Sequence, residues 1–254
     1  MEKIKYDALT LVPNEDGTAY CIAECDKNAV NVNIPVQVNG IYIDAILENA
    51  FEDCSKLKSV TFDMPSSKQI ENDEVLTSIG SYAFSKCTAL EKIDLPDCVI
   101  TVDRGAFYGC HSLESVTFNS YAYIGPFAFY ECVKLKHCSP IGGIVCEGAF
   151  YQCEGLATLP INEETTEIDE EAFGHCYGLT DVVLPKSIKR IEALAFRGCH
   201  GLKSVVFENT SKWYSVNCYF DKESELDLTD PQANAQALSR MDFDDGVIDW
   251  HTKA

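Results

Sequence analysis

Residues 83–96 read AFSKCTALEKIDLP, and residues 172–185 read AFGHCYGLTDVVLP. Both stretches begin with Ala-Phe, carry Cys three and Leu six residues after the Phe, and end in Leu-Pro. The Ala-Phe pair occurs seven times, and after a first interval of 33 residues the spacing is 23, 22, 21, 23 and 23. Such regular spacing predicts a repeat protein. The phenylalanines are Phe51, Phe84, Phe107, Phe129, Phe150, Phe173 and Phe196.

Every copy carries the same apolar positions around its phenylalanine. Ile or Val precedes it by five residues, and positions nine and eleven after it are mostly apolar, as in Ile93 and Leu95. Phe and Cys, three residues apart, would share one face of a helical or 3₁₀ turn, whereas the last apolar pair alternates as a strand demands. One such unit cannot bury its own apolar face, so we expect the units to stack around a continuous core.

The motif A-F-x-x-C-x-x-L-x-x-I-x-L-P resembles the BspA-like leucine-rich repeat family, over roughly residues 30–210. The resemblance implies an α/β leucine-rich-repeat solenoid, a right-handed curved arc with parallel β-strands on the concave face and short 3₁₀ or helical turns on the convex side. It also implies adhesive or interaction roles, often at a microbial surface. The family has diverse partners, so the resemblance says more about fold than about function.

The two ends of the chain predict caps, because a stack of repeats exposes apolar edges. Residues 1–44 are interpreted as a β-rich N-terminal cap with a degenerate repeat, since residues 8–12 and 18–24 flank a hairpin signal at 14–17. The seven repeats occupy residues 45–208. Residues 209–254 are interpreted as a C-terminal cap or tail. Asp230 and Pro231 suit the first positions of a helix over about 231–240, and residues 246–250 predict a last strand.

Three features interrupt the repeat. Pro140 ends repeat four and Pro160 lies inside the expected strand of repeat five. Proline lacks the N–H that a β-ladder needs, so both strands are predicted to be short or irregular. The longer first interval contains the polar residues 63–75, which predict a protruding loop.

The acidic composition of the chain limits the classes of binding partner that we expect. With 40 acidic and 20 basic residues the formal net charge is −20, so nucleic acid and anionic membranes are not expected, and a protein partner is expected to be basic. No apolar run is long enough to predict membrane insertion. Residues 1–7 show no apolar signal-peptide core, and this predicts a cytoplasmic location. Removal of a leader would instead make it a secreted or cell-surface protein.

The thirteen cysteines are expected to be free thiols. Seven of them repeat with the fold, and a free Cys is among the residues most often buried, so we interpret this column as core packing rather than as a metal store or a redox device. Cys21 and Cys25 lie four apart in a predicted strand without a nearby His pair, so no metal site is expected there. Unpaired thiols also favour a reducing compartment.

No catalytic or cofactor motif is found. Three histidines adjoin a column cysteine, as in Cys110-His111, but adjacent residues of a turn point in different directions and cannot form a catalytic pair. Residues 242–246 have the wrong acid spacing for a calcium loop. The serine-hydrolase, metalloprotease, Walker A and dinucleotide motifs are absent. We therefore expect no enzyme activity and no cofactor.

Besides the loop expected over residues 63–75, two surfaces are candidates for binding. The residue after Phe is Tyr in three successive repeats, and these side chains predict an aromatic stripe on the convex face. The concave face presents small, polar and charged residues between the strand leucines, and concave solenoid surfaces commonly bind ligands. The candidate residues on the two surfaces are Tyr108, Tyr130 and Tyr151 for the stripe, and Lys92, Asp94, His137 and Asp181 for the concave face.

The sequence therefore predicts a non-enzymatic interaction module that presents a solenoid surface to an unknown protein or cell-surface ligand. One alternative is an exported adhesin or a carbohydrate-binding protein, with a glycan as its partner. Another is a structural protein with weak self-association.

Overall fold

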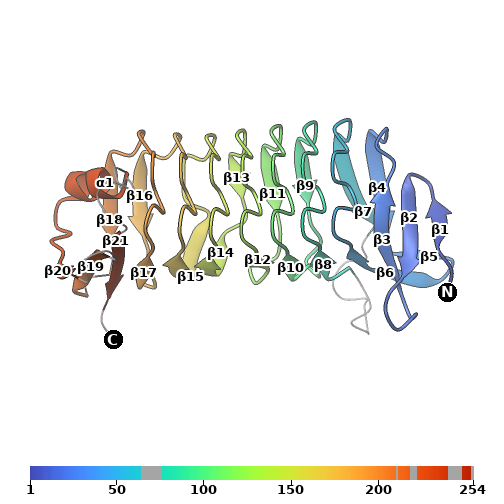
Figure 1. The fold of residues 1–254 in the computed structure, drawn as a ribbon, viewed down its shortest axis with the longest axis horizontal. Coiled ribbons are helices and arrows are strands. Elements are labelled where there is room, and N and C mark those ends of the chain that lie inside the picture. Colours follow the sequence, from blue (N-terminus) through green and yellow to red (C-terminus); the bar gives the residue numbers. More distant parts are fainter. Residues whose placement is uncertain (64–75, 210, 218–221, 240–247, 253–254) are drawn as a thin grey trace. The chain divides into compact units, whose positions relative to one another are not determined.

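The computed structural model describes residues 1–63, 76–209, 211–217, 222–239 and 248–252. The chain divides into two compact units, residues 1–139 and 140–254, and each unit is described by itself. Both are built almost entirely from short β-strands (Figure 1). Within the described residues, no helix has the length and apolar character needed to span a membrane.

The first unit contains two sheets in which successive coils pair in parallel. One sheet uses the Ile or Val that precedes each phenylalanine, and the other uses the strand that follows the repeat leucine. The first sheet has the order β1 (Ile4–Tyr6), β2 (Leu9–Pro13), β3 (Tyr20–Cys25), β6 (Ile41–Ile46), β8 (Ser78–Ile79), β10 (Thr101–Val102) and β12 (Tyr123–Ile124), with β5 (Gln37–Val38) paired to β6. The second has the order β13 (His137–Cys138), β11 (Ser115–Thr117), β9 (Lys92–Asp94), β7 (Ser59–Asp63) and β4 (Asn31–Pro35).

The second unit continues the same plan and ends in antiparallel strands and a helix. Its larger sheet has the order β14 (Ile141–Val145), β15 (Ile161–Ile168), β17 (Arg190–Ile191), β21 (Ile248–Thr252), β19 (Trp213–Asn217) and β20 (Lys222–Glu225). A separate pair consists of β16 (Asp181–Leu184) and β18 (Ser204–Phe207), and the helix α1 spans Pro231–Ser239. Asp230 caps α1, because its carboxylate accepts hydrogen bonds from the backbone N–H groups of Gln232 and Ala233 at 2.9 and 3.2 Å.

The segment around each phenylalanine differs from the expected 3₁₀ or helical turn. In all seven repeats the residues two before and two after the Phe have positive φ, as in Tyr82 (54°) and Lys86 (57°) around Phe84. A left-handed residue at both places stops a helix from propagating. The freed N–H groups reach the next coil instead: the N–H groups of Tyr82, Phe84 and Lys86 donate to carbonyls of that coil at 2.7–2.9 Å. These turns thus form a third ladder along the stack.

The core is a column of stacked rings with a column of thiols beside it. All seven phenylalanines are fully buried. In the first unit ring centroids lie 4.5 Å apart for Phe51–Phe84, 5.2 Å for Phe84–Phe107 and 5.5 Å for Phe107–Phe129. Five of the column thiols donate to the carbonyl of the phenylalanine one coil earlier, for example Cys110 Sγ to Phe84 O at 3.1 Å and Cys199 Sγ to Phe173 O at 3.0 Å. The cysteine column therefore satisfies backbone carbonyls as well as filling space.

Several local predictions are confirmed. β2 and β3 form the hairpin around residues 14–17, and α1 and β21 lie close to the expected helix and last strand. Proline has the expected effect in both places, since β13 is two residues long and Thr158–Pro160, where repeat five should place its strand, form none. Most of the loop expected over residues 63–75 lies outside the described residues.

Candidate functional site

The polar candidates of the first unit interact with one another. Lys92 Nζ forms an ion pair with Asp94 Oδ2 at 2.7 Å, and Thr117 Oγ1 donates to Asp94 Oδ1 at 2.9 Å. These contacts lower the pKa of Asp94 below its usual value, with the Lys92 bond as the largest cause. His137 is exposed at the start of β13. Lys92 and Asp94 therefore largely neutralise each other's charge at the surface of the sheet.

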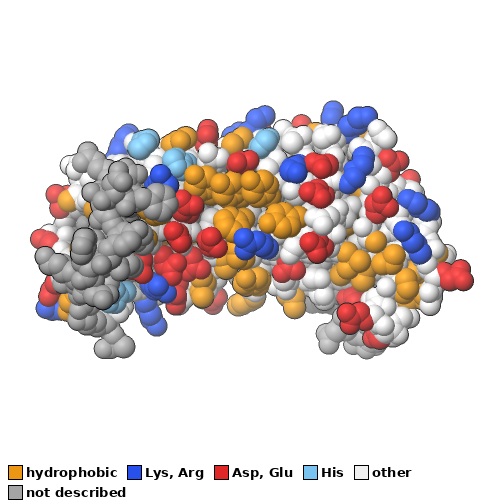
Figure 2. Space-filling model, viewed as in Figure 1, with side chains coloured by type: hydrophobic (Ala, Val, Ile, Leu, Met, Phe, Trp, Pro, Cys, Tyr) orange, Lys and Arg blue, Asp and Glu red, His pale blue; other side chains and the backbone are white. Residues whose placement is uncertain are grey.

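The tyrosines of the first unit form a ladder. The rings of Tyr108 and Tyr130 stack with centroids 4.9 Å apart and planes 3° apart, and Tyr82 tilts against Tyr108 at 6.5 Å. Phe127 meets the Tyr130 ring edge-on, and the Arg104 guanidinium lies 4.5 Å above the Phe127 ring. Figure 2 shows hydrophobic side chains gathered on the viewed face over β11 and β13. Because Tyr108 and Tyr130 cover each other's faces, they offer mainly edges and hydroxyls to a ligand.

The third tyrosine of the expected stripe belongs to the second unit. Tyr151 packs edge-on against His175, with centroids 5.2 Å apart. His175 Nδ1 lies 3.1 Å from the Tyr177 hydroxyl, and Tyr177 stacks on His200. Burial, with Arg197 as a further cause, lowers the pKa of His175 below its usual value, so the imidazole is neutral at pH 7. In the second unit the aromatic contacts therefore involve His side chains as well as Tyr side chains.

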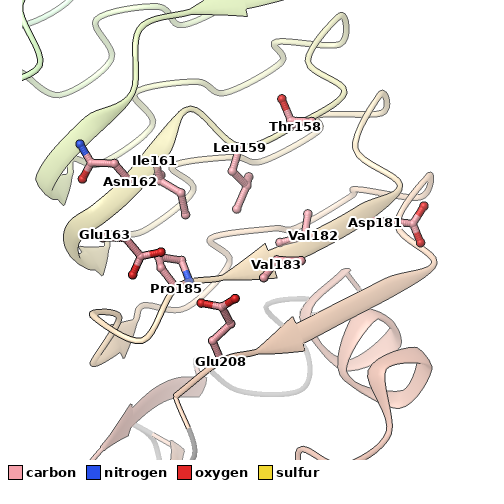
Figure 3. Close-up of a pocket in the computed structure, with 10 residues that line it drawn as sticks. All are labelled: Thr158, Leu159, Ile161, Asn162, Glu163, Asp181, Val182, Val183, Pro185 and Glu208. Carbon is pink, nitrogen blue, oxygen red and sulfur yellow. The ribbon is translucent and has the colours of Figure 1, made fainter.

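A hollow of about 290 Å³ lies in the second unit beside β16. β16 pairs with β18 along one edge, whereas on its other side Thr158–Pro160 form no strand. The hollow is lined by residues of 158–163, by residues of 181–185 and by Glu208 (Figure 3). We call it the β16 hollow. It exists because Pro160 interrupts the ladder at the point where a regular repeat would cover the neighbouring strand.

The β16 hollow combines apolar walls with acidic side chains. Leu159, Ile161, Val183 and Pro185 contribute apolar surface, and Val183 is 55% exposed. Figure 3 shows Glu163 beside Pro185 and the Glu208 carboxylate directed toward Val183, while Asp181 stands at the opposite end of β16. None of the described residues that line it is Lys, Arg or His. The hollow can therefore accept an apolar stem that carries a positive charge.

Of the seven candidate residues, the structure brings together Lys92 with Asp94 and Tyr108 with Tyr130, and it places Asp181 at the hollow. Sequence reasoning did not identify Glu163 and Glu208, which are fifteen or more residues from Asp181. The available signal was Pro160, because a proline in one strand predicts uncovered surface on the next coil.

The described thiols are not arranged as a metal site. Among the described residues no group of three or more His, Cys, Asp or Glu side chains is arranged to hold a metal ion. All twelve described cysteines are free, and Cys218 lies outside the described residues. Burial raises the pKa of Cys110 and Cys176 well above the usual value, and that of Cys199 to about 12, so these column thiols stay protonated and unreactive at neutral pH.

Known structures share this fold. A T. pallidum leucine-rich repeat protein is 24% identical and superposes with a TM-score of 0.62, covering 79% of this chain and 90% of its own. A leucine-rich repeat protein from Eubacterium ventriosum is 20% identical with a TM-score of 0.53, covering 72% of this chain and 56% of its own. No functionally curated protein matches the sequence. At these identities the likeness concerns the fold alone.

The family model for the BspA type leucine rich repeat region matches six copies, over residues 46–144 and 140–243. These ranges contain the whole phenylalanine, cysteine and leucine columns, which begin at Phe51, Cys54 and Leu57. The chain therefore belongs to the BspA-type leucine-rich repeat family.

Proposed function

We propose that the protein is a non-enzymatic interaction module that binds a protein ligand through the β16 hollow. The ligand would insert a lysine or arginine side chain. Its aliphatic stem would pack on Leu159, Val183 and Pro185, and its charge would face Glu163 and Glu208. Members of this repeat family are generally binding modules rather than enzymes.

The missing strand beside β16 is the observation that carries this proposal. β9, for comparison, is paired along both edges, with β7 from the preceding coil and with β11 from the next. β16 is paired with β18 along one edge, and no strand of the described chain lies along its other edge. The surface left uncovered there carries acidic side chains, and none of the described residues that line it is basic. A concave apolar site with a few charged groups is the common form of a recognition pocket. Pockets for drug-sized ligands span roughly 300–1,000 Å³. The volume of about 290 Å³ lies just below this range and suits a single amino-acid side chain.

A carbohydrate-binding or adhesin role is the alternative, and self-association is another. Sugar rings commonly pack on open aromatic faces, and the Tyr108–Tyr130 stack leaves few of those. The tyrosine edges remain a second surface for a protein ligand. A variant in which Tyr108 and Tyr130 are changed to Ala therefore serves as a comparison in the experiment below.

The test is a selection of displayed random peptides on the immobilised protein. We expect enrichment of peptides in which Lys or Arg neighbours aliphatic residues. The double variant Glu163→Gln/Glu208→Gln keeps the shape of the hollow and removes its charge. Each lost carboxylate should weaken binding of a selected peptide by about 0.2–1 kcal/mol, the range typical of exposed ion pairs.

The matched control is Glu15→Gln/Glu24→Gln, which removes the same charge from exposed sites on the first unit. It should bind the selected peptides as well as the wild type does. Equal loss in both double variants would show that net charge alone attracts the peptides. Loss only in the Tyr108→Ala/Tyr130→Ala variant would place the binding surface on the tyrosine ladder. Either result would overturn the proposal.

A further inference from the structure

Two thiols meet at the start of the repeat stack. The Cys25 N–H donates to the Ala50 carbonyl at 2.7 Å, and the Phe51 N–H makes the same bond to the Ala83 carbonyl at 2.7 Å. Cys25, the last residue of β3, therefore occupies in its coil the position that phenylalanine holds in every repeat. Cys54 is the first member of the cysteine column, and it lies in the neighbouring coil.

The sulfur of Cys54 has surroundings unlike those of the later column members. Cys87 donates to the carbonyl of Phe51, 3.2 Å away in the preceding coil. The coil before Cys54 has no such phenylalanine, and the Cys54 sulfur instead lies 4.0 Å from the carbonyl oxygen of Asp26. The Cys25 sulfur lies 3.6 Å from that same oxygen. The two sulfurs therefore converge on one carbonyl oxygen, whereas Cys87, Cys110 and Cys132 each have a different phenylalanine carbonyl as partner.

The environment makes the two thiols chemically unequal. The neighbouring Cys25 thiol is the largest cause that lowers the pKa of Cys54 below the usual thiol value, and the Lys27 ammonium contributes further. The Cys54 thiol, together with burial, raises the pKa of Cys25. Cys54 is thus the thiol that ionises first, and Cys25 is the proton donor beside it. Both side chains are buried, with 1% and 0% of their surface exposed, so only a small oxidant can reach them.

We propose that Cys25 and Cys54 form a dithiol site that a peroxide oxidises to a disulfide. The Cys54 thiolate attacks one oxygen of hydrogen peroxide and breaks the O–O bond. This step gives a sulfenic acid at Cys54 and, with one proton, a water molecule. The Cys25 sulfur then attacks the Cys54 sulfur and displaces the hydroxyl, which leaves as a second water with the Cys25 proton. Two thiols are oxidised and one peroxide is reduced to two waters.

The bond would tie β3 to the first repeat at the end of the stack. β4, which follows β3 in the chain, is the edge strand of its sheet, so this end is among the parts of a repeat stack that open most readily. A covalent link across this edge restricts that opening. The site is independent of the β16 hollow, which belongs to the other unit.

The test starts from the fully reduced, full-length protein, treated with one equivalent of hydrogen peroxide at pH 7.5. Remaining thiols are then alkylated, and the chain is digested for mass spectrometry. We expect a Cys25–Cys54 cross-linked peptide, two thiols lost per chain, and a cross-linking rate at least tenfold above the rate of Cys199 oxidation. The oxidised protein should also melt at a higher temperature than the reduced protein.

Two variants extend the test. Cys25→Ser should leave a sulfenic acid at Cys54 that dimedone traps when the oxidised protein is unfolded in its presence, and the melting temperature of this variant should not respond to peroxide. Cys98→Ser, which changes a half-buried free thiol, should cross-link as the wild type does. The wild-type digest does not depend on the folding of any variant. Absence of the Cys25–Cys54 peptide while other cysteines oxidise, or equal rates at Cys54 and Cys199, would overturn the proposal.

Discussion

Each phenylalanine of the column is buried among nearly the same neighbours. These neighbours determine how much one phenylalanine contributes to the free energy of unfolding. Phe129 is fully buried, lies 5.5 Å from Phe107 and 6.2 Å from Phe118 by ring centroids, and cannot be replaced without leaving a cavity. Phe129→Ala should lower the free energy of unfolding by about 3–5 kcal/mol. Urea denaturation measures this free energy of unfolding. Tyr121→Ala, at a side chain that is 78% exposed, should change it by less than about 0.5 kcal/mol.

The thiol column makes stability depend on alkaline pH. Burial raises the pKa of Cys199 from 9.0 to about 12, so the folded state keeps this thiol protonated where the unfolded chain ionises it. The contribution of Cys199 is therefore complete below pH 9 and declines as the pH rises from 9 toward 12. In urea denaturation at pH 8 to 11, Cys199→Ala should start less stable and lose less stability with pH than the wild type. Parallel pH curves for the two proteins would contradict this explanation.

At the scale of the element, the cap of α1 gives a direct prediction. The Asp230 carboxylate accepts hydrogen bonds from two N–H groups in the first turn, and the helix buries Asn234, Ala235 and Leu238. Asp230→Ala should lower the free energy of unfolding by about 1 kcal/mol. Thermal denaturation can measure the loss. Gln236→Ala, at an exposed position of the same helix, should be close to neutral, and equal losses would show that capping is not the cause.

The repeat columns, the β2–β3 hairpin and the start of α1 could be predicted because each depends on local spacing or on a single residue type. The turns around the phenylalanines could not. Glycine marks their left-handed positions in some coils, as at Gly105 and Gly109, but Tyr82, Phe127 and Leu194 adopt positive φ elsewhere. Those residues disfavour that conformation locally. The hydrogen bonds between coils outweigh the local preference, and a single coil read alone does not contain them.

The candidate site was predictable only in part. Asp181 lies on a predicted strand face, and Pro160 indicates where the ladder breaks. Glu163 lies in β15, after repeat five, and Glu208 follows β18 in repeat seven. Both reach the hollow because these coils lie next to the coil of β16, and the chain positions involved are 45 residues apart, so local spacing does not reveal the cluster. The pairing of Cys25 with Cys54 likewise depends on which coil position Cys25 occupies, and the four-residue spacing from Cys21 gives no sign of it.

For the whole molecule, a formal charge of −20 would attract basic peptides to any part of the surface. Only a change of charge confined to the β16 hollow can therefore show whether the hollow itself recognises the peptide. The most direct measurement is the peptide selection repeated on Glu163→Lys/Glu208→Lys, which leaves the chain strongly acidic as a whole. If the β16 hollow is the recognition site, the selected peptides should change from Lys- or Arg-bearing to Asp- or Glu-bearing sequences. If the variant still selects the same basic peptides as the wild type, the hollow is not the recognition site and the proposed function is wrong.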